Sequence, residues 1–256
     1  MTPPIPKLKP LVWISSAKKD LLACPNDVQQ VFGYALHVAQ EGGTHRQTKA
    51  MKGFGGAGVL EIIEDDDGNT FRAVYTVKLA GTVYVLHVFQ KKSRHGVATP
   101  KQDIDLIKAR LRIATENHQT SRTLAKIRTL TMARIEKSSG NVFEDLGFPD
   151  AATHQIKAAL VSQIAKLIDD QGLSQTKAAE RMGMAQPDVS KMLRGLFRPI
   201  SLERLLQCVT ALGGDVEISV NSPRAPASAG RAPRIGRLSL KARSKRAASR
   251  GIRKSA

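Results

Sequence analysis

The chain of 256 residues has few of the features on which disulfide-stapled and membrane proteins depend. Its 2 cysteines, Cys24 and Cys208, fall in what we interpret as different domains, so they predict neither a disulfide framework nor a cysteine ligand cluster. The apolar run near its start, Leu11 to Ile14, is far shorter than a secretory core or a membrane span. We therefore expect a protein of the reducing cytoplasm without a membrane partner.

Signals for metals and nucleotide cofactors are missing as well. The 6 histidines show no metal-ligand spacing. The stretch from Gly53 to Gly58 is rich in glycine but lacks the GK[ST] ending of a phosphate-binding loop. We therefore expect no metal and no cofactor.

Basic residues, by contrast, are abundant, and the formal net charge is +18. The excess lies in the first half and in the last 35 residues, which carry 11 basic residues and no acidic residue. A basic first half and a basic tail fit polyanionic partners, and a soluble charged surface is the alternative. Residues 222–256 contain almost no core-forming side chains, which predicts a disordered basic tail that either binds phosphates or is an unselected extension.

The stretch from Leu173 to Gly195 has the spacing of a helix-turn-helix. Small or apolar residues stand where two crossed helices meet, and Gly183 stands at the turn. A plain helical hairpin in a bundle is the alternative. Eight positions resemble the XRE-type helix-turn-helix family, in particular HigA-like antitoxins: Gln175, Ala178, Ala179, Gly183, Gln186, Val189, Ser190 and Gly195.

This resemblance implies operator DNA as a partner. The residues that we expect to contact DNA are Gln175, Gln186, Pro187, Ser190, Lys191 and Arg194. Ala185 departs from the family, which usually places a serine or threonine there to cap the recognition helix, but we still expect the helix to form.

The DNA-binding domain is expected to span residues 141–221. A helix from His154 to Asp170 precedes the motif, and a helix capped by Ser201 follows it. Residues 215–220 alternate as a short strand, which two copies could pair across a twofold axis to form a homodimer.

The N-terminal part, residues 1–116, predicts a small antiparallel sheet with helices, and so an α+β fold. Ser16 is expected to cap the first of two helices that Pro25 divides, and a helix is expected from Lys101 to about Ala114. The expected strands cover residues 10–15, 59–64, 70–79 and 82–90. The last strand, apolar on both faces, is expected inside the sheet.

The element order and the segments MKGFGGAGVLEI, FRAVY, VLHVFQKK and TPKQDIDLIKARL resemble the RelE/HigB superfamily of toxins, especially its phage-derived branch, over residues 10–114. The resemblance implies a ribosome-dependent endoribonuclease that acts on mRNA, and the family pairs with HigA-like antitoxins. Both halves of such a pair are present in this one chain.

Cutting RNA through its own 2′-hydroxyl needs proton transfer and cations, and no metal. We expect Arg72 and Lys92 to stabilise phosphate, Lys91 and Lys52 to hold the RNA backbone with Arg94, and His95 to transfer the proton.

These residues have plainer interpretations. The basic residues from Lys91 to Arg94 could be a solvated loop, and His87 is read as a core histidine with a backbone partner. Tyr75 and Tyr84 are expected to pack rather than to stack on bases. Ile62 stands where many relatives carry an arginine, so one expected cation is missing.

Residues 117–140 are polar and predict a linker in which Met132 marks the start of the antitoxin half. Residues 141–150 carry Glu144 and Asp145 between Phe143 and Phe148. They either lay carboxylates on the basic toxin surface or cap the DNA-binding bundle with their aromatic rings.

The leading interpretation is a fused type II toxin–antitoxin protein, in which an mRNA-cleaving half is restrained by an autorepressing DNA-binding half. The competing interpretation is a transcriptional regulator whose N-terminal domain is catalytically inactive.

Overall fold

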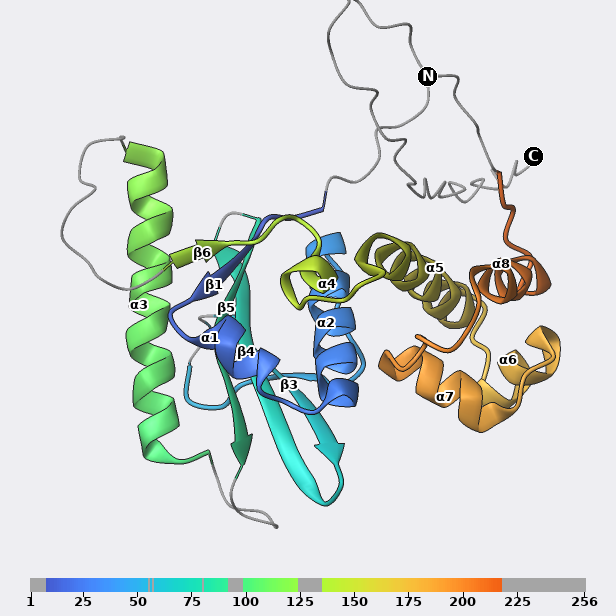
Figure 1. The fold of residues 1–256 in the computed structure, drawn as a ribbon, viewed down its shortest axis with the longest axis horizontal. Helices are drawn as coiled ribbons and strands as arrows, with labels where there is room; N and C mark the ends of the chain where they lie inside the picture. The colour runs from blue at the N-terminus through green and yellow to red at the C-terminus, as the bar shows by residue number, and fades with distance from the viewer. Residues whose placement is uncertain are drawn as a thin grey trace, which may run out of the picture.

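The computed structural model describes residues 8–54, 56, 58–79, 81–91, 99–123 and 135–217. An N-terminal domain of sheet and helices lies beside a C-terminal group of helices, with α2 and α5 next to each other where they meet (Figure 1). The predicted α+β fold class is confirmed.

The strands of the described part form one six-stranded sheet in the order β2-β3-β4-β5-β1-β6. Consecutive strands from β3 to β5 pair antiparallel, as the hairpin signals predict, with Gly68 and Gly81 at positive φ in the two turns. The bounds are β1 Leu11–Ile14, β2 Thr48–Ala50, β3 Val59–Asp66, β4 Asn69–Leu79, β5 Thr82–Lys91 and β6 Ile135–Lys137. β5 lies inside the sheet, as predicted, because β1 pairs parallel to it through Trp13 and Val85.

Three features of this domain differ from expectation. β2 forms an edge strand that the sequence did not signal. The expected linker contains the end of helix α3 (Lys101–Thr123) and the strand β6, which pairs antiparallel with β1. Ser16 makes no capping hydrogen bond to the backbone of α1 (Ala17–Leu22), because its hydroxyl donates to Asp20 instead.

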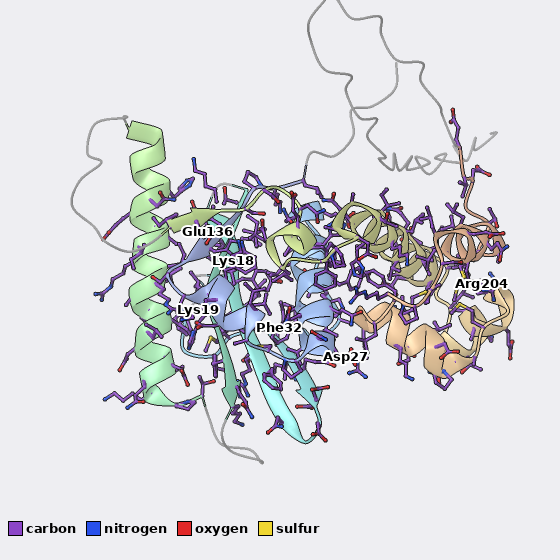
Figure 2. The ribbon with its side chains drawn as sticks, viewed as in Figure 1. Lys18, Lys19, Asp27, Phe32, Glu136 and Arg204 are labelled. Atoms are coloured by element: carbon purple, nitrogen blue, oxygen red, sulfur yellow. The ribbon has the colours of Figure 1, made fainter. Side chains whose placement is uncertain are left out.

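β6 is held to the domain by a side-chain contact as well. Lys18 of α1 donates to Glu136 of β6 at 2.6 Å, and Figure 2 places the two residues side by side. A segment that follows the expected toxin boundary therefore completes the edge of the toxin-side sheet.

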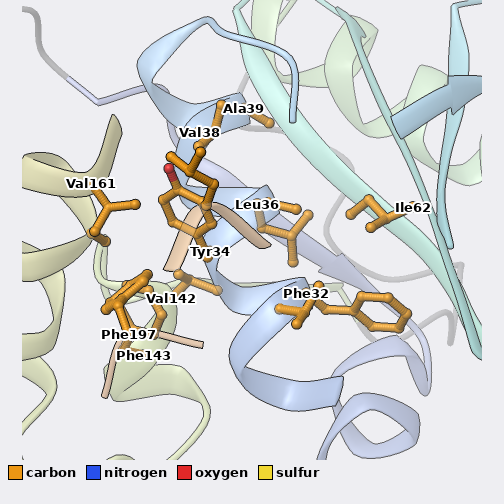
Figure 3. Close-up of a cluster of buried hydrophobic side chains, with 14 of the residues drawn as sticks. Phe32, Tyr34, Leu36, Val38, Ala39, Ile62, Val142, Phe143, Val161 and Phe197 are labelled. Carbon is orange, nitrogen blue, oxygen red and sulfur yellow. The ribbon is translucent and has the colours of Figure 1, made fainter. Parts of the chain in front are cut away.

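Helix α2 (Asn26–Glu41) is buried on nearly every side, from Gln30 to Gln40. A helix that is buried all round must be covered on opposite faces. Figure 3 shows Phe32 and Leu36 turned toward Ile62 of the sheet, while Tyr34 and Val38 turn toward the C-terminal helices. α2 is thus the middle layer between the two halves.

The C-terminal half contains the four predicted helices, which are α5 Ala151–Asp170, α6 Gln175–Met182, α7 Gln186–Arg194 and α8 Leu202–Ala211. A short helix that was not predicted, α4 Val142–Asp145, precedes them. Ser201 caps α8 by accepting from the amide of Arg204, as predicted, and Ser174 caps α6 in the same way. Residues 215–217 of the expected dimer strand form no regular element, and residues 218–220 lie outside the described part.

A single hydrophobic core joins the halves. It contains Phe32 and Ala73 from the N-terminal domain together with Val161, Met192 and Phe197 from the C-terminal one. A second, smaller core lies between α3 and the other face of the sheet. The N-terminal sheet is therefore covered by α3 on one face and, through α2, by the DNA-binding half on the other.

Candidate nucleic-acid interfaces

The helix-turn-helix has the geometry that its spacing predicts. Helices α6 and α7 meet over buried Ala178, Met182 and Val189, and Gly183 makes the turn at a φ of +60°. Arg204 of α8 donates to the carbonyls of Met182 and Gly183, which lack helical partners. Figure 2 shows Arg204 at this outer end of the molecule. The turn is thus fixed from a third helix, and that contact was not foreseen.

The start of α7 is open to solvent and carries polar side chains. Gln186, Pro187 and Lys191 are exposed, and Ser190 is half-buried. Gln186 donates to the Gln175 side chain at 2.9 Å, which links the first turns of α6 and α7 into one polar surface. A glutamine amide presents a donor and an acceptor together, which suits the edge of a base in the major groove.

Ala185 stands at the N-cap of α7 with extended backbone and makes no side-chain cap. Pro187 lies in the first turn, where a missing amide donor costs nothing. The helix forms without the cap, as expected.

Arg194, expected to contact DNA, lies in a different environment. Its guanidinium forms an ion pair with Glu64 of β3, which also accepts from Gln47. The Glu64 side chain is only 3% exposed, whereas that of Arg194 is 42% exposed. The end of the recognition helix therefore contacts the N-terminal domain.

Only some of the residues that were expected to contact RNA lie in the described part of the chain. Lys92, Arg94 and His95 lie outside the described residues. Arg72 of β4 pairs with Phe89 and Thr70 pairs with Lys91, so Arg72 and Lys91 follow each other along the hairpin on one face of the sheet. Lys52 is exposed in the loop before β3.

Arg72 already has partners. It donates to Glu61 at 2.7 Å and to the hydroxyl of Thr99 at 3.0 Å, and its Nε is buried with no partner in the described part of the chain. The side chains of Arg72 and Glu61 are 14% and 11% exposed. The neighbouring Glu61 carboxylate holds the Arg72 guanidinium in place and neutralises part of its charge. Glu61 is a residue of this cluster that the sequence reasoning did not single out.

His87 is buried, as predicted, but its partners are side chains rather than the backbone. Its Nε2 lies 3.1 Å from Asp103 Oδ1, and its Nδ1 lies 3.2 Å from Arg110. Because a guanidinium only donates, Nδ1 accepts and Nε2 carries the proton. Burial lowers the pKa of His87. Both ring nitrogens of the neutral imidazole are therefore used in tying β5 to α3.

Asp103 and Arg110 were missed by sequence reasoning, although a signal was present. They stand seven residues apart on α3, and such a spacing puts two side chains on one face. Tyr75 and Tyr84 are 1% and 3% exposed, so they pack as expected and are not free to stack on bases.

Residues 141–150 contact the N-terminal domain through aromatic side chains. Phe143 is fully buried against Gly33 and the ring of His154. Asp145 accepts from the indole of Trp13 at 3.0 Å, and Glu144 is exposed. Both alternatives for the aromatic rings fit this geometry, because Phe143 packs on α2 and also on His154 of α5. The partner of Asp145 on the N-terminal domain is the indole N–H of Trp13.

Two further observations concern the described part only. No helix there is both apolar enough and long enough to cross a membrane. No group of three or more histidine, cysteine, aspartate or glutamate side chains gathers there in a way that could hold a metal ion.

The fold and these surfaces define a class: a helix-turn-helix DNA-binding protein joined to a small α+β domain. Residues 142–221 match a helix-turn-helix domain family, and residues 19–112 match the family described as phage-derived protein Gp49-like. A solved structure titled "Putative XRE Family Transcriptional Regulator" is 38% identical; the match covers 37% of this chain and all of that one, with a TM-score of 0.31. No curated protein matches.

Residues 142–221 are thus an XRE-type helix-turn-helix domain, and residues 19–112 before them are a Gp49-like toxin domain of the RelE/HigB type. The chain is a fused toxin–antitoxin protein with a DNA-binding domain.

Proposed function

We propose that the N-terminal domain cleaves mRNA on the ribosome and that the C-terminal domain both restrains this activity and represses transcription from its own operator. The observation that carries the repressor half is the exposed polar start of α7, where Gln186 is hydrogen-bonded to Gln175. Lys191 lies farther along the same helix, exposed, where it can neutralise a backbone phosphate.

The proposed nuclease activity rests on two cations, Lys91 at the end of β5 and Arg72 on the neighbouring strand β4. Arg72 is positioned by Glu61 and Thr99, and Lys91 follows on the same face of the sheet. Preorganised cations of this kind stabilise the charge that gathers on a phosphate during transesterification. Residues 92–98, which include the proposed proton-transfer residue His95, follow Lys91 directly in the sequence.

Restraint, in this proposal, acts through α2 rather than by covering the cations. Arg72 and Val74 both lie on the face of the sheet that α3 covers, whereas the DNA-binding half reaches the sheet through α2 on the opposite face. The docked half enlarges the toxin domain and so keeps it from entering a narrow site on the ribosome.

Expression of residues 1–140 in cells tests the nuclease half. This range keeps β6 and the end of α3, which a boundary at residue 116 would remove. Translation arrest with new mRNA ends inside ribosome-bound messages is expected, and co-expression of residues 141–256 should relieve it.

An Arg72→Ala control in the same range should abolish cleavage. A folded 1–140 product that leaves messages intact would instead favour an inactive interaction domain. For the repressor half, footprinting upstream of the gene should show protection that Lys191→Ala and Gln186→Ala weaken.

A further inference from the structure

The last turn of the recognition helix belongs to two surfaces at once. Lys191 and Arg194 are its two basic residues, three positions apart and so on neighbouring parts of one helix face. Lys191 is exposed, whereas the Arg194 guanidinium binds Glu64 of the toxin domain. Lys191 is therefore accessible to a DNA phosphate, whereas Arg194 already binds a carboxylate.

Glu64 is built into the toxin domain so that it faces this arginine. It lies on β3 opposite Phe71, it is 3% exposed, and its oxygens accept from Gln47 and Arg194. A buried carboxylate needs a cation or several donors to offset its lost hydration. Arg194 is the cation among its partners, so Glu64 favours the docked position of α7.

The backbone beside Arg194 is held as well. His45 Nε2 lies 3.3 Å from the carbonyl oxygen of Leu193. Gly195, which ends α7, lies so close to Val31 that an added Cβ would be 3.0 Å from its Cα. These contacts hold the end of α7 in place against the N-terminal domain while the domains stay docked.

We propose that Glu64 and a DNA phosphate are alternative partners of Arg194, so that docking of the toxin domain weakens DNA binding by the same chain. This inference rests on the proposed operator binding and adds its regulation. Undocking frees Arg194 for a phosphate, and DNA that captures Arg194 in turn favours the undocked toxin domain, because such coupling is reciprocal.

The test measures the affinity of the full chain for a labelled duplex taken from directly upstream of its own reading frame, over a series of salt concentrations. Glu64→Gln keeps the shape and the acceptor for Gln47 but removes the charge that holds Arg194. We expect it to bind the duplex about 5-fold more tightly or better. The log–log slope against salt should steepen by about one, since one more phosphate is neutralised.

Asp65→Asn is the matched control. Asp65 is the next residue of β3, it is exposed, and it accepts from Thr70. The variant changes the net charge equally without touching the Arg194 contact. Its affinity should stay within about 2-fold of wild type, because a surface charge in water acts weakly.

A double-mutant cycle separates the contact from general electrostatics. In an Arg194→Gln background, Glu64→Gln should no longer tighten binding. Equal gains from Glu64→Gln and Asp65→Asn, or a gain that persists without Arg194, would overturn the inference while leaving operator binding in place. Absence of binding by wild type and every variant would overturn operator binding itself, and this inference with it.

Discussion

Gly195 ends the recognition helix where that helix meets the toxin domain, and alanine at this position should force the two halves apart. Its φ is +119°, a conformation that an L-residue adopts only with strain. A Cβ there would lie 3.0 Å from the Cα of Val31 and 3.1 Å from the Cβ of Tyr34. The Val31 Cα is backbone of a buried helix, so it cannot give way as a flexible side chain would.

The expected loss of stability has two parts. The left-handed backbone costs roughly 1–2 kcal/mol for a residue with a Cβ. Overpacking a close contact adds about 1–3 kcal/mol. Gly213→Ala separates the two, because Gly213 also follows a helix at positive φ, +81°, but has nothing within 4 Å of an added Cβ. That variant should lose only the first part.

Calorimetry of the full chain measures the difference. Wild type should unfold in one transition, since one core joins the halves. Gly195→Ala should melt about 2–12 °C below Gly213→Ala, or split into two transitions if the halves separate first. Equal melting temperatures for the two variants would show that the close approach of α7 to α2 does not carry the docking.

Three more predictions follow from the same structure. Burial lowers the pKa of His45 and of His154 to about 4. In the unfolded chain the histidine pKa is about 6.5, so the unfolded state takes up protons first as the pH falls, and stability should drop between pH 6.5 and 4, by on the order of 2 kcal/mol per histidine at pH 5. Urea titrations at several pH values measure this drop, and a His154→Leu variant with an equally steep pH dependence would contradict it. Ala185→Ser should supply the missing cap of α7 and raise stability by about 1 kcal/mol, measured as a higher urea midpoint, and an unchanged midpoint would mean that water already satisfies those amides. Arg46 and Asp169 form an exposed ion pair at 3.0 Å across the domains, so Arg46→Ala should cost less than about 1 kcal/mol, and a larger loss in the same titration would refute this.

The features that could be predicted from the sequence are mostly local. The spacing from Gln175 to Gly195 predicted both helices and the turn of the DNA-binding motif, because a helix-turn-helix is built from contacts between residues close in the chain. The hairpins around Gly68 and Gly81 were predicted for the same reason, since their backbone conformation depends on the turn residues themselves.

The burial of helix α2 on both sides could not be predicted from its sequence. Gln30, His37 and Gln40 recur on it at helical spacing, a pattern typical of a solvent-facing stripe, yet all three are buried. A helix that is buried all round is covered on two sides. The sequence pattern could not predict that the DNA-binding half covers the second side of α2, because the residues of a helix do not specify which distant element packs against them.

The local pattern of this chain, then, determined that a toxin-type sheet and a DNA-reading bundle are present. Only the tertiary structure decided how the two are joined: β6 completes the sheet beside β1, Asp145 binds Trp13, and Arg194 binds Glu64. These partners are more than a hundred residues apart, and their meeting depends on how whole elements pack. Backbone preferences and periodicity act over a few residues, whereas the contact between Arg194 and Glu64 depends on which part of the sheet packs against the end of α7.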